Sequence, residues 1–403
     1  MTREPVAIVL PWYGPETAGG AEAHARHLVR TLDSVGINVE VWTTNARDAR
    51  APLAPFYPLG DQELDGVRVR RFPANLGTGM HITRHYPADH AIHELNLLHS
   101  LTGSDALLES LAAQRDQRRW VFFLYAFPTS FWGAHIAGER GYLIPCLHDE
   151  PYARYSTTRR VLRSVNKVLA NSAPEQQLIC HLADIDAQRV LVVGEGIELH
   201  WRGDAQRFRR EHKLDGPFMF FTGRRDHTKN FPLLLAYFEE YLARRGSRIK
   251  LVVGGPGEFT IPPALRTSII DLGFVAEQTK HDAYAAADIF CMPSLLESFS
   301  IVIMEAWLQG TPALVHADCA VTVEHCRRSN GGLWFGSYRQ FEACLDRLLA
   351  EPATARQLGA QGREWVQREC RWEDVAQRFI AAVYEAKPRH QQPEARATFI
   401  GTC

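Results

Sequence analysis

The sequence predicts an α/β protein made of two Rossmann-like domains that face each other across a cleft. Short apolar runs of strand length alternate with helical stretches along most of the chain, as in a parallel sheet covered by helices on both faces. This alternation pauses in a polar stretch at 199–215 and then starts again, and a length of 403 residues favours two domains. Ligands of such sheets bind where the strands end, so we expect the functional site in the cleft.

Composition and charge indicate an ordinary soluble protein rather than a nucleic-acid or membrane protein. The formal net charge is −1, which gives no electrostatic reason to expect nucleic acid as a partner. None of the eight cysteines forms a Cys-x2-Cys pair, so neither a zinc site nor a disulfide framework is indicated, and a reducing cytoplasm is expected. Residues 1–4 run directly into a strand-like segment and no apolar run reaches membrane-spanning length, so neither a signal peptide nor a membrane span is expected.

The first predicted elements form a βαβ unit. A strand over 6–10 is followed by a loop that ends in Gly19 and Gly20, where a phosphate or a sugar can approach the backbone closely. A helix then stops at Gly36, and a second strand covers 37–44. The helix has apolar residues at helical spacing, and its predicted buried face consists of Ala25, Leu28, Val29, Leu32 and Val35.

The rest of the first half continues the alternation after an irregular stretch. Proline-rich loops after residue 46 precede a strand over 67–72 and helices over 91–101 and 105–114. Further strands, separated by helical stretches, are predicted at 120–124, 142–146, 167–170 and 189–193.

A polar triplet follows the predicted strand at 142–146. His148, Asp149 and Glu150 lie where that strand ends, at the edge of the sheet where ligands bind. His148 is therefore a candidate site residue. The alternatives are an ordinary loop histidine, or a metal site formed by the three side chains together.

Four basic residues come next at near-helical spacing. Such a stripe is usually a solvated helix face. The alternative is a weak peripheral contact with anionic lipid headgroups at the inner face of a membrane. The stripe consists of Arg159, Arg160, Arg163 and Lys167.

The segment after the strand at 189–193 does not match a dinucleotide-binding fingerprint. Gly194 and Gly196 would need a third glycine at position 199, where the chain has Leu199. We therefore expect no dinucleotide cofactor and assign no role to Glu195 or Glu198. The polar stretch that follows, 199–215, is predicted to be the linker between the domains.

The second domain begins with a strand over 218–221, a turn and a helix over 231–242. Arg224 and Lys229 lie in the turn, before the start of the helix. Arginine can bind phosphate through two N–H groups and lysine supplies a compact charge, so the pair predicts a phosphate site. The alternative is two solvated surface cations, and Arg225 is a weaker second choice. Further apolar segments follow at 249–253 and 273–275, a helix is expected around 281–287, and a buried strand is expected at 288–292. The last predicted helices cover 338–350, 353–369 and 372–386.

The stretch from Ser294 to Pro312 carries the most chemical information. It leaves a buried strand, turns, and enters a helix over 301–308 that Gly310 ends. Free amide groups and the positive end of the helix dipole in such a turn favour phosphate. Glu297 lies in the turn and Glu305 lies within the helix, and eight helical residues span ~12 Å. Carboxylates suit hydroxyl groups, so this arrangement predicts a nucleotide-sugar; the alternative is an ordinary helix with one buried and one solvated glutamate.

The motif Pro-Ser-x-x-Glu-Ser-Phe-Ser-x4-Glu-Ala resembles the donor-site motif of the retaining glycosyltransferases of family 4, which have the two-domain GT-B fold. The resemblance spans nearly the whole chain and is strongest over 218–312. It implies that Glu297 holds sugar hydroxyls and that Glu305 holds the ribose. Ser298 and Ser300 replace glycines that are common in the family.

The resemblance also implies roles for residues outside the motif. Arg224 and Lys229 would neutralise the donor diphosphate, and His148 would point at the donor sugar. The Gly-Gly-Ala-Glu sequence that starts at Gly19 is similar to the family loop that meets donor phosphate and acceptor. The remaining donor contacts implied are Gly20 in the same loop and Phe274 and Val275 at the nucleobase side. In the turn before the helix they are Ser298, Phe299, Ser300 and Ile301.

The resemblance, together with these features, implies a retaining hexosyltransferase of polysaccharide or lipopolysaccharide biosynthesis. Arg224 and Lys229 supply the charge for the diphosphate, so the enzyme is expected to be metal-independent. It would move a hexose from a UDP- or GDP-linked donor to a hydroxyl of a glycan or glycolipid precursor, with no cofactor. The Asp-x-Asp sequence at 184–186 is attributed to chance. The alternatives are a nucleotide-sugar epimerase on the same fold and a non-catalytic subunit that binds nucleotide-sugar.

The expected division of the chain follows the GT-B pattern. Residues 1–198 form the N-terminal acceptor domain, and a helix over 372–386 returns to it. Residues 199–371 form the donor domain, and residues 387–403 are expected to be a tail.

Overall fold

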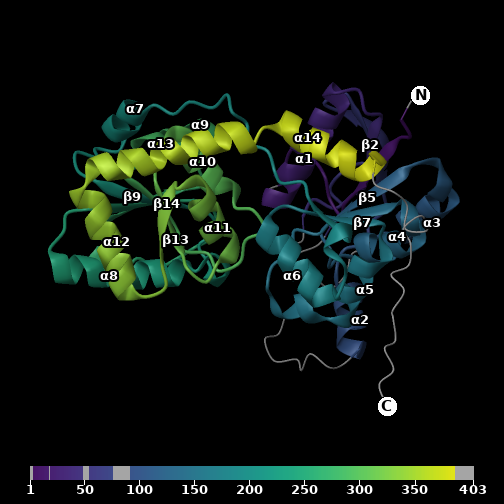
Figure 1. The fold of residues 1–403 in the computed structure, drawn as a ribbon, viewed down its shortest axis with the longest axis horizontal. Coiled ribbons are helices and arrows are strands. Elements are labelled where there is room, and N and C mark those ends of the chain that lie inside the picture. Colours follow the sequence, from purple (N-terminus) through teal and green to yellow (C-terminus); the bar gives the residue numbers. More distant parts are fainter. Residues whose placement is uncertain (1–2, 18, 49–53, 76–90, 386–403) are drawn as a thin grey trace, which may run out of the picture.

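The computed structural model describes residues 3–17, 19–48, 54–75 and 91–385 (Figure 1). The predicted tail at 387–403 lies outside these residues. Two α/β domains stand side by side, each with its own sheet, as the sequence predicts.

The N-terminal domain contains an eight-stranded sheet in the order β3-β4-β2-β1-β5-β6-β7-β8. Every pair of neighbours is parallel except β3 and β4, which form an antiparallel hairpin at one edge. The sequence did not predict β3, because a polar edge strand lacks the apolar run that identifies a buried strand. The strands are β1 (Val6–Val9), β2 (Val39–Thr44), β3 (Gly60–Leu64), β4 (Val67–Phe72), β5 (Arg119–Phe123), β6 (Gly141–Ile144), β7 (Lys167–Ala170) and β8 (Val190–Val192).

Helices cover both faces of this sheet. On one face α1 buries Ala25, Leu28, Val29 and Leu32 as predicted, but Val35 caps the helix end and is half exposed, so its predicted burial is wrong. The hydrophobic core on the other face of the sheet is formed with helices that follow β4 in the sequence. The helices are α1 (Gly20–Ser34), α2 (Ala91–Ser100), α3 (Asp105–Ala113), α4 (Pro128–Ala137), α5 (Ser156–Ser164) and α6 (Ala173–Ala183).

The C-terminal domain contains a six-stranded, fully parallel sheet in the order β11-β10-β9-β12-β13-β14. Its central strands are buried apolar runs, which is why the sequence identified them. β11, at the edge, is half-buried and was not predicted as a strand. The strands are β9 (Phe218–Thr222), β10 (Lys250–Gly254), β11 (Ile269–Gly273), β12 (Ile289–Met292), β13 (Ala313–His316) and β14 (Gly332–Phe335).

Two helices of this domain correct the sequence prediction. α7 lies within the stretch predicted to be a linker, because Phe208 is buried against Phe218 of the domain core. α11 is not among the helices that the sequence predicts. The helices are α7 (Ala205–Glu211), α8 (Phe231–Arg245), α9 (Glu277–Ala286), α10 (Ile301–Gln309), α11 (Ala320–Ser329), α12 (Tyr338–Ala350) and α13 (Pro352–Glu369).

The chain crosses between the domains twice. After β8 it enters the second domain, and after α13 it returns as α14 (Trp372–Ile380), which packs on α1 (Figure 1). The two crossings meet where the backbone N–H of Ile197 donates to the carbonyl oxygen of Cys370, 2.8 Å away. A π-helical turn, Ala381–Glu385, ends the described chain. α14 therefore packs against the core of the N-terminal domain.

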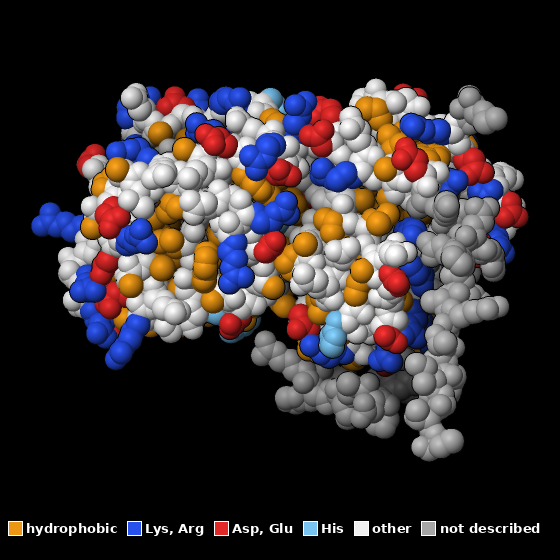
Figure 2. All heavy atoms as spheres, in the orientation of Figure 1, with side chains coloured by type: hydrophobic (Ala, Val, Ile, Leu, Met, Phe, Trp, Pro, Cys, Tyr) orange, Lys and Arg blue, Asp and Glu red, His pale blue; other side chains and the backbone are white. Residues whose placement is uncertain are grey.

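The molecular surface has no dominant sign of charge on the face shown in Figure 2, where cationic and anionic side chains are interspersed. This mixture agrees with the net charge of −1. Among the described residues, no helix combines the length and the apolar character needed to cross a membrane.

Candidate active site

A cleft of about 840 Å³ separates the two domains. The loop after β1 and the start of α1 form one wall, and α9 and the start of α10 form the other. A Cβ atom placed on Gly20 would lie 3.8 Å from Cδ1 of Ile301, so the first residues of α1 and α10 face each other. The positive ends of two helix dipoles therefore meet in the cleft, an arrangement that favours a phosphate group.

The predicted donor turn connects β12 to α10. Ser300, its last residue, has a left-handed backbone with φ of 76°, which costs a residue other than glycine about 1–2 kcal/mol. Its Oγ atom is buried and has no hydrogen-bond partner among the described residues. Phe299 is buried against the ring of His325, with ring centroids 5.1 Å apart. The turn is thus fixed on one side by packing and carries an unpaired hydroxyl.

Glu297 and Lys229 form an ion pair, with 2.7 Å between Oε1 and Nζ. The glutamate follows β12 and the lysine follows β9, its neighbour in the sheet. Asp226 orders the lysine turn, because its carboxylate accepts hydrogen bonds from the backbone N–H groups of Thr228 and Lys229. The residues expected to bind sugar and diphosphate are therefore adjacent in space, although 68 positions separate them.

Arg224 and Arg225 differ sharply in their surroundings. Arg224 is mostly exposed, and its Nη2 atom lies 2.9 Å from Oγ1 of Thr228. Its positive charge acts on Glu22 and Tyr152 of the other domain. Arg225 is buried, paired with Asp271 and packed on the ring of Phe259, so it holds the domain together. Arg225 is thus an incorrect choice for a donor cation.

His148 approaches this centre from the N-terminal domain. Its Nδ1 atom lies 3.5 Å from Oε1 of Glu150, which also accepts a hydrogen bond from the hydroxyl of Tyr125. Burial opposes protonation of His148, yet the hydrogen bond to Glu150 and the charges of Glu150 and Glu297 raise its pKa overall. The charge of Glu297, in the other domain, thus acts on His148.

Asp149 turns away from His148 and pairs with Arg154 in solvent. The three side chains at 148–150 therefore do not converge, and the metal-site alternative for them is not supported among the described residues. The three potential ligand side chains that do approach one another are Glu277, His281 and Glu305.

Glu305 has two partners from α9. Lys280 Nζ lies 2.9 Å from its Oε1 atom, and the hydroxyl of Tyr284 donates to Oε2 over 3.0 Å. Lys280 also pairs with Glu277 at 2.9 Å. Burial lowers the pKa of Lys280, but the charges of Glu305 and Glu277 raise it above its usual value. The sequence analysis missed these partners, although Glu277, Lys280 and Tyr284 share one helix face by their spacing.

The predicted nucleobase side of the cleft is formed by the end of β11. Phe274 lines the cleft and is 80 % exposed, the most exposed of the large apolar side chains described. Val275 is half-buried beside it. The exposed ring of Phe274 is therefore free to contact a ligand in the cleft.

The sequence did not point to two acidic residues, one beside the cleft and one that lines it. Glu22 accepts a hydrogen bond of 2.6 Å from Nε1 of Trp12, and burial raises its pKa despite that bond and the charges of Arg26 and Arg224. Glu195 lies 3.7 Å from His24 at the base of the cleft. Burial and the charges of nearby carboxylates raise the pKa of Glu195 well above its usual range. In the sequence, only the glycines near these two residues could have pointed to them as site residues.

Two family models match this chain. The model described as "Glycosyltransferase Family 4" matches residues 18–201, and the model described as "Glycosyl transferases group 1" matches residues 203–365. The D-inositol 3-phosphate glycosyltransferase of Frankia alni is 30 % identical over 385 residues, which cover 87 % of this chain and 91 % of that relative. The D-inositol 3-phosphate glycosyltransferase of Kineococcus radiotolerans is 27 % identical, with 86 % of each chain covered.

Solved structures with the same architecture include sucrose-phosphate synthase from Thermosynechococcus elongatus. It is 18 % identical, with a TM-score of 0.68 and coverage of 94 % of this chain and 97 % of that one. HepE of Anabaena, in a complex with UDP and glucose, is 16 % identical, with a TM-score of 0.68 and coverage of 95 % and 100 %. The two sheets, the returning helix, the sequence matches and these structures agree: the chain belongs to the group 1 glycosyltransferases of family 4 and has the GT-B fold.

Proposed function

We propose that the protein transfers a hexose from a UDP- or GDP-linked donor to a hydroxyl group, with retention of the anomeric configuration. The observation that carries this proposal is the pairing of Lys229 with Glu297 beside the start of α10, with Glu305 eight residues further on. Glu297, the cation with the helix terminus, and Glu305 would then match the sugar, the diphosphate and the ribose of a nucleotide-sugar, in that order. The UDP complex of the similar HepE structure is consistent with such a donor.

The diphosphate would lie between the starts of α1 and α10. Departure of the nucleotide breaks the bond between the anomeric carbon and the phosphate oxygen, and negative charge develops on that oxygen. Arg224, Lys229 and the backbone N–H groups of the turn would stabilise this charge, which is an electrostatic contribution to catalysis. Lys229 must then share its charge between Glu297 and the phosphate.

The acceptor hydroxyl would attack the same face of the sugar that the phosphate leaves. A new bond forms between the acceptor oxygen and the anomeric carbon, and the acceptor proton passes to the departing phosphate oxygen. Glu297 and His148 would orient the sugar from opposite domains as positive charge develops on its ring. Glu305 would hold the ribose, with Lys280 and Tyr284 fixing the carboxylate.

No divalent metal ion is required in this scheme. Arg224, Lys229 and two helix termini supply the positive charge that a metal would otherwise provide. The three potential ligands Glu277, His281 and Glu305 already have Lys280 between two of them. A metal ion there would have to displace this ammonium group.

The acceptor is proposed to be a hydroxyl of a glycan or glycolipid precursor, bound by the N-terminal domain. The relatives named above act on inositol 3-phosphate, so a small polyol phosphate is a second acceptor class to compare. Arg26 and Arg30 line the N-terminal wall and could meet such a phosphate. Arg159 and Arg160 on α5 are the exposed candidates for a weak contact with a membrane surface.

The test is a set of incubations with single donors, UDP-glucose and GDP-mannose first, without and with acceptor. A glycosyltransferase hydrolyses its donor slowly alone and transfers the sugar once D-inositol 3-phosphate or a glycan acceptor is present. A new sugar nucleotide formed without acceptor would identify an epimerase, and no reaction together with tight binding of UDP would identify a binding subunit. Either result would contradict the proposed function.

A further inference from the structure

The side chain of Glu150 lies beside the ring of His148, two residues earlier in the chain. Oε1 of Glu150 is 3.5 Å from Nδ1 of His148, and the side chain of Glu150 is 11 % exposed. The same oxygen accepts a hydrogen bond of 2.8 Å from the hydroxyl of Tyr125, which is buried. Tyr125 follows β5, whereas the other two residues follow β6, its neighbour in the sheet. One carboxylate oxygen therefore joins the ends of two neighbouring strands to the ring of His148.

A tight backbone turn and a pair of stacked rings fix the position of Glu150. Its backbone N–H donates to the carbonyl oxygen of His148 over 2.9 Å, and its own carbonyl oxygen accepts from the N–H of Ala153 over 3.0 Å. The rings of Tyr125 and Tyr152 are stacked, with centroids 6.0 Å apart. Burial raises the pKa of Tyr125 well above its usual range, and the charge of Glu150 acts in the same direction. The hydroxyl of Tyr125 therefore keeps its proton and donates a hydrogen bond to Glu150.

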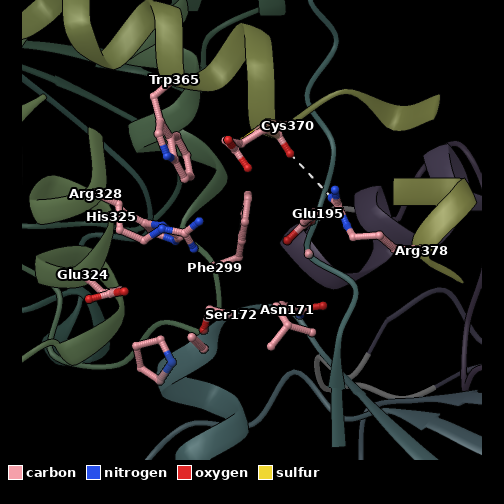
Figure 3. Close-up of a pocket in the computed structure, with 15 residues that line it drawn as sticks. Asn171, Ser172, Glu195, Phe299, Glu324, His325, Arg328, Trp365, Cys370 and Arg378 are labelled. Atoms are coloured by element: carbon pink, nitrogen blue, oxygen red, sulfur yellow. Dashed lines mark hydrogen bonds between the residues drawn. The ribbon is translucent and has the colours of Figure 1, made fainter. Parts of the chain in front are cut away.

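The backbone before His148 is held separately, by a buried carboxylate of α6. Oε1 of Glu175 accepts a hydrogen bond of 2.6 Å from the N–H of Leu147, and its Oε2 atom accepts one from the N–H of Asn171. Asn171 follows β7 and lines the smaller cavity shown in Figure 3. The loop that carries His148 thus has a fixed start. The orientation of the ring then depends on its side-chain contacts, of which Glu150 supplies the one to Nδ1.

Charges of the proposed donor site act on the same segment from the other domain. The charge of Glu297 acts on His148, and the charge of Arg224 acts on Tyr152. Glu297 and Arg224 follow strands β12 and β9 of the C-terminal sheet, whereas His148 and Tyr152 follow β6 of the N-terminal sheet. The two domains therefore bring this segment within electrostatic reach of residues that would hold the sugar and the diphosphate.

A carboxylate beside one nitrogen of an imidazole ring favours a proton on that nitrogen. With Glu150 beside Nδ1, neutral His148 carries its proton on Nδ1, and its Nε2 atom can accept a hydrogen bond from a hydroxyl group. Contacts between catalytic groups often shorten when substrate binds. We propose that Glu150 is a positioning residue, which fixes the orientation and the tautomer of His148 so that Nε2 accepts a hydrogen bond from a hydroxyl of the donor sugar. This inference rests on the proposed function.

The first experiment reads the position of the ring proton by ¹⁵N NMR of the full chain without substrate, in alkaline buffer where histidine rings are neutral. His148→Gln identifies the signals of His148 by their loss. Wild type should carry the proton on Nδ1. Glu150→Leu should move it toward Nε2, which is the preferred site in free histidine. An unchanged proton position in Glu150→Leu would overturn the proposal.

Glu150→Gln is nearly isosteric and serves if the leucine variant does not fold. Its amide oxygen can still accept from Nδ1, but the negative charge is lost. The pKa of His148 should therefore be lower than in wild type, because the hydrogen bond to Glu150 and its charge raise that pKa. The same NMR signals, followed through a pH titration, measure this change. An unchanged pKa would show that the carboxylate does not act on the ring and would also overturn the proposal.

Asp149→Leu is the matched control, since Asp149 lies between the two residues in sequence and pairs with Arg154 in solvent. It should leave the position of the ring proton and the rate of donor turnover as in wild type. An equal displacement of the ring proton in Asp149→Leu and Glu150→Leu would show a general disturbance of the loop and would contradict a specific role of Glu150.

The second experiment asks whether Glu150 acts through His148, using the hydrolysis of UDP-glucose and GDP-mannose. Glu150→Leu should lower the rate about two- to tenfold, the effect of one hydrogen bond, and Glu150→Gln should recover most of the loss. Affinity for bare UDP or GDP should stay unchanged, because the bare nucleotide lacks the sugar. In a chain that already carries His148→Gln, Glu150→Leu should have no further effect. Effects of the two substitutions that multiply would give Glu150 a merely structural role.

Only the second experiment depends on the proposed function. If neither donor is consumed by the wild-type chain, that function fails, while the ring signals still show whether Glu150 fixes His148. If the donor is consumed and Glu150→Leu keeps the full rate, the role of Glu150 in transfer is excluded.

Discussion

Lys280 holds Glu305 from the neighbouring helix, with 2.9 Å between its ammonium nitrogen and the carboxylate oxygen Oε1. Lys229 holds Glu297 in a similar way at 2.7 Å. Each glutamate of the donor motif is therefore paired with a lysine from a different element. A bound donor has to share these partners or replace them, so the two glutamates should respond differently to substitution.

Glu305→Gln should weaken binding of the bare nucleoside diphosphate, because the ribose is present in donor and product alike. A hydrogen bond to a charged group contributes about 1.5–3 kcal/mol, so a ten- to hundredfold loss of affinity is expected. Glu297→Gln should leave bare-nucleotide affinity nearly unchanged and lower turnover, since it meets only the sugar. Calorimetry with UDP and GDP and a turnover assay measure both effects.

Glu277→Gln is the matched control for Glu305, because Glu277 also pairs with Lys280 but is more exposed. Its effect on nucleotide affinity should be much smaller. The assignment of the two roles fails if Glu297→Gln weakens the bare nucleotide as much as Glu305→Gln does, or if both variants keep full turnover.

Ser300→Gly and Ser300→Ala separate the backbone of the donor turn from its hydroxyl. Glycine removes the cost of the left-handed backbone and should raise the free energy of unfolding by about 1 kcal/mol, whereas alanine should not. Both remove the unpaired hydroxyl and should weaken donor binding about two- to tenfold. Chemical denaturation and calorimetry give the two quantities.

Asn330→Gly provides the comparison, since Asn330 also has a left-handed backbone and lies at the end of α11. It should leave donor binding unchanged. Donor affinity equal to wild type in Ser300→Gly would show that the hydroxyl of Ser300 does not contact the donor.

Activity should survive treatment with EDTA, because Arg224, Lys229 and the helix termini supply the charge that a metal ion would provide. The measurement is the rate of donor hydrolysis before and after chelation and after dialysis. A loss of activity that magnesium or manganese restores would refute metal independence and direct attention to Glu277, His281 and Glu305.

Sedimentation with anionic vesicles should be weak even at low salt. Lys167, which the sequence placed in a basic stripe, is buried in β7 and donates to the carbonyl oxygen of Gln188; the stripe prediction is wrong for this residue. Arg163 binds the end of α6, so Arg159 and Arg160 remain. The membrane alternative would be restored by strong sedimentation that high salt reverses and that the double variant Arg159→Gln, Arg160→Gln abolishes. The control is the double variant Arg339→Gln, Arg356→Gln, which changes two exposed arginines of the other domain.

His325 should make folding less stable in mild acid. Its pKa is lowered to about 4 by burial, so below about pH 6.5 the unfolded chain binds a proton that the folded protein does not. Between pH 6.5 and pH 5 this difference should cost about 2 kcal/mol of unfolding free energy, since one pKa unit corresponds to about 1.4 kcal/mol. His325→Phe should lose correspondingly less stability over this range in urea titrations. A loss equal to that of wild type would show that His325 titrates normally in the folded protein.

The sequence by itself determined the alternation of buried strands and helices, because the apolar runs of β1, β5, β9 and β12 need no partner to be recognised. It also placed Glu297, Arg224 and Lys229 at strand ends and before helix starts, and Glu305 within the helix that follows, since glycine, proline and charge mark those boundaries. Polar edge elements such as β3 left no comparable pattern. The buried Phe208 of α7 was hidden in a polar stretch.

Only the tertiary structure decided which charges meet. Arg224 and Arg225 are neighbours in sequence, yet Arg224 is mostly exposed and Arg225 is buried against Asp271. The pairs Lys229–Glu297 and Lys280–Glu305 join separate elements of one sheet domain, and the charge of Glu297 acts on His148 in the other domain. The spacing of apolar residues in the sequence indicates which residues of one helix or strand are buried. The contacts between charges depend instead on how elements that are distant in the sequence pack together.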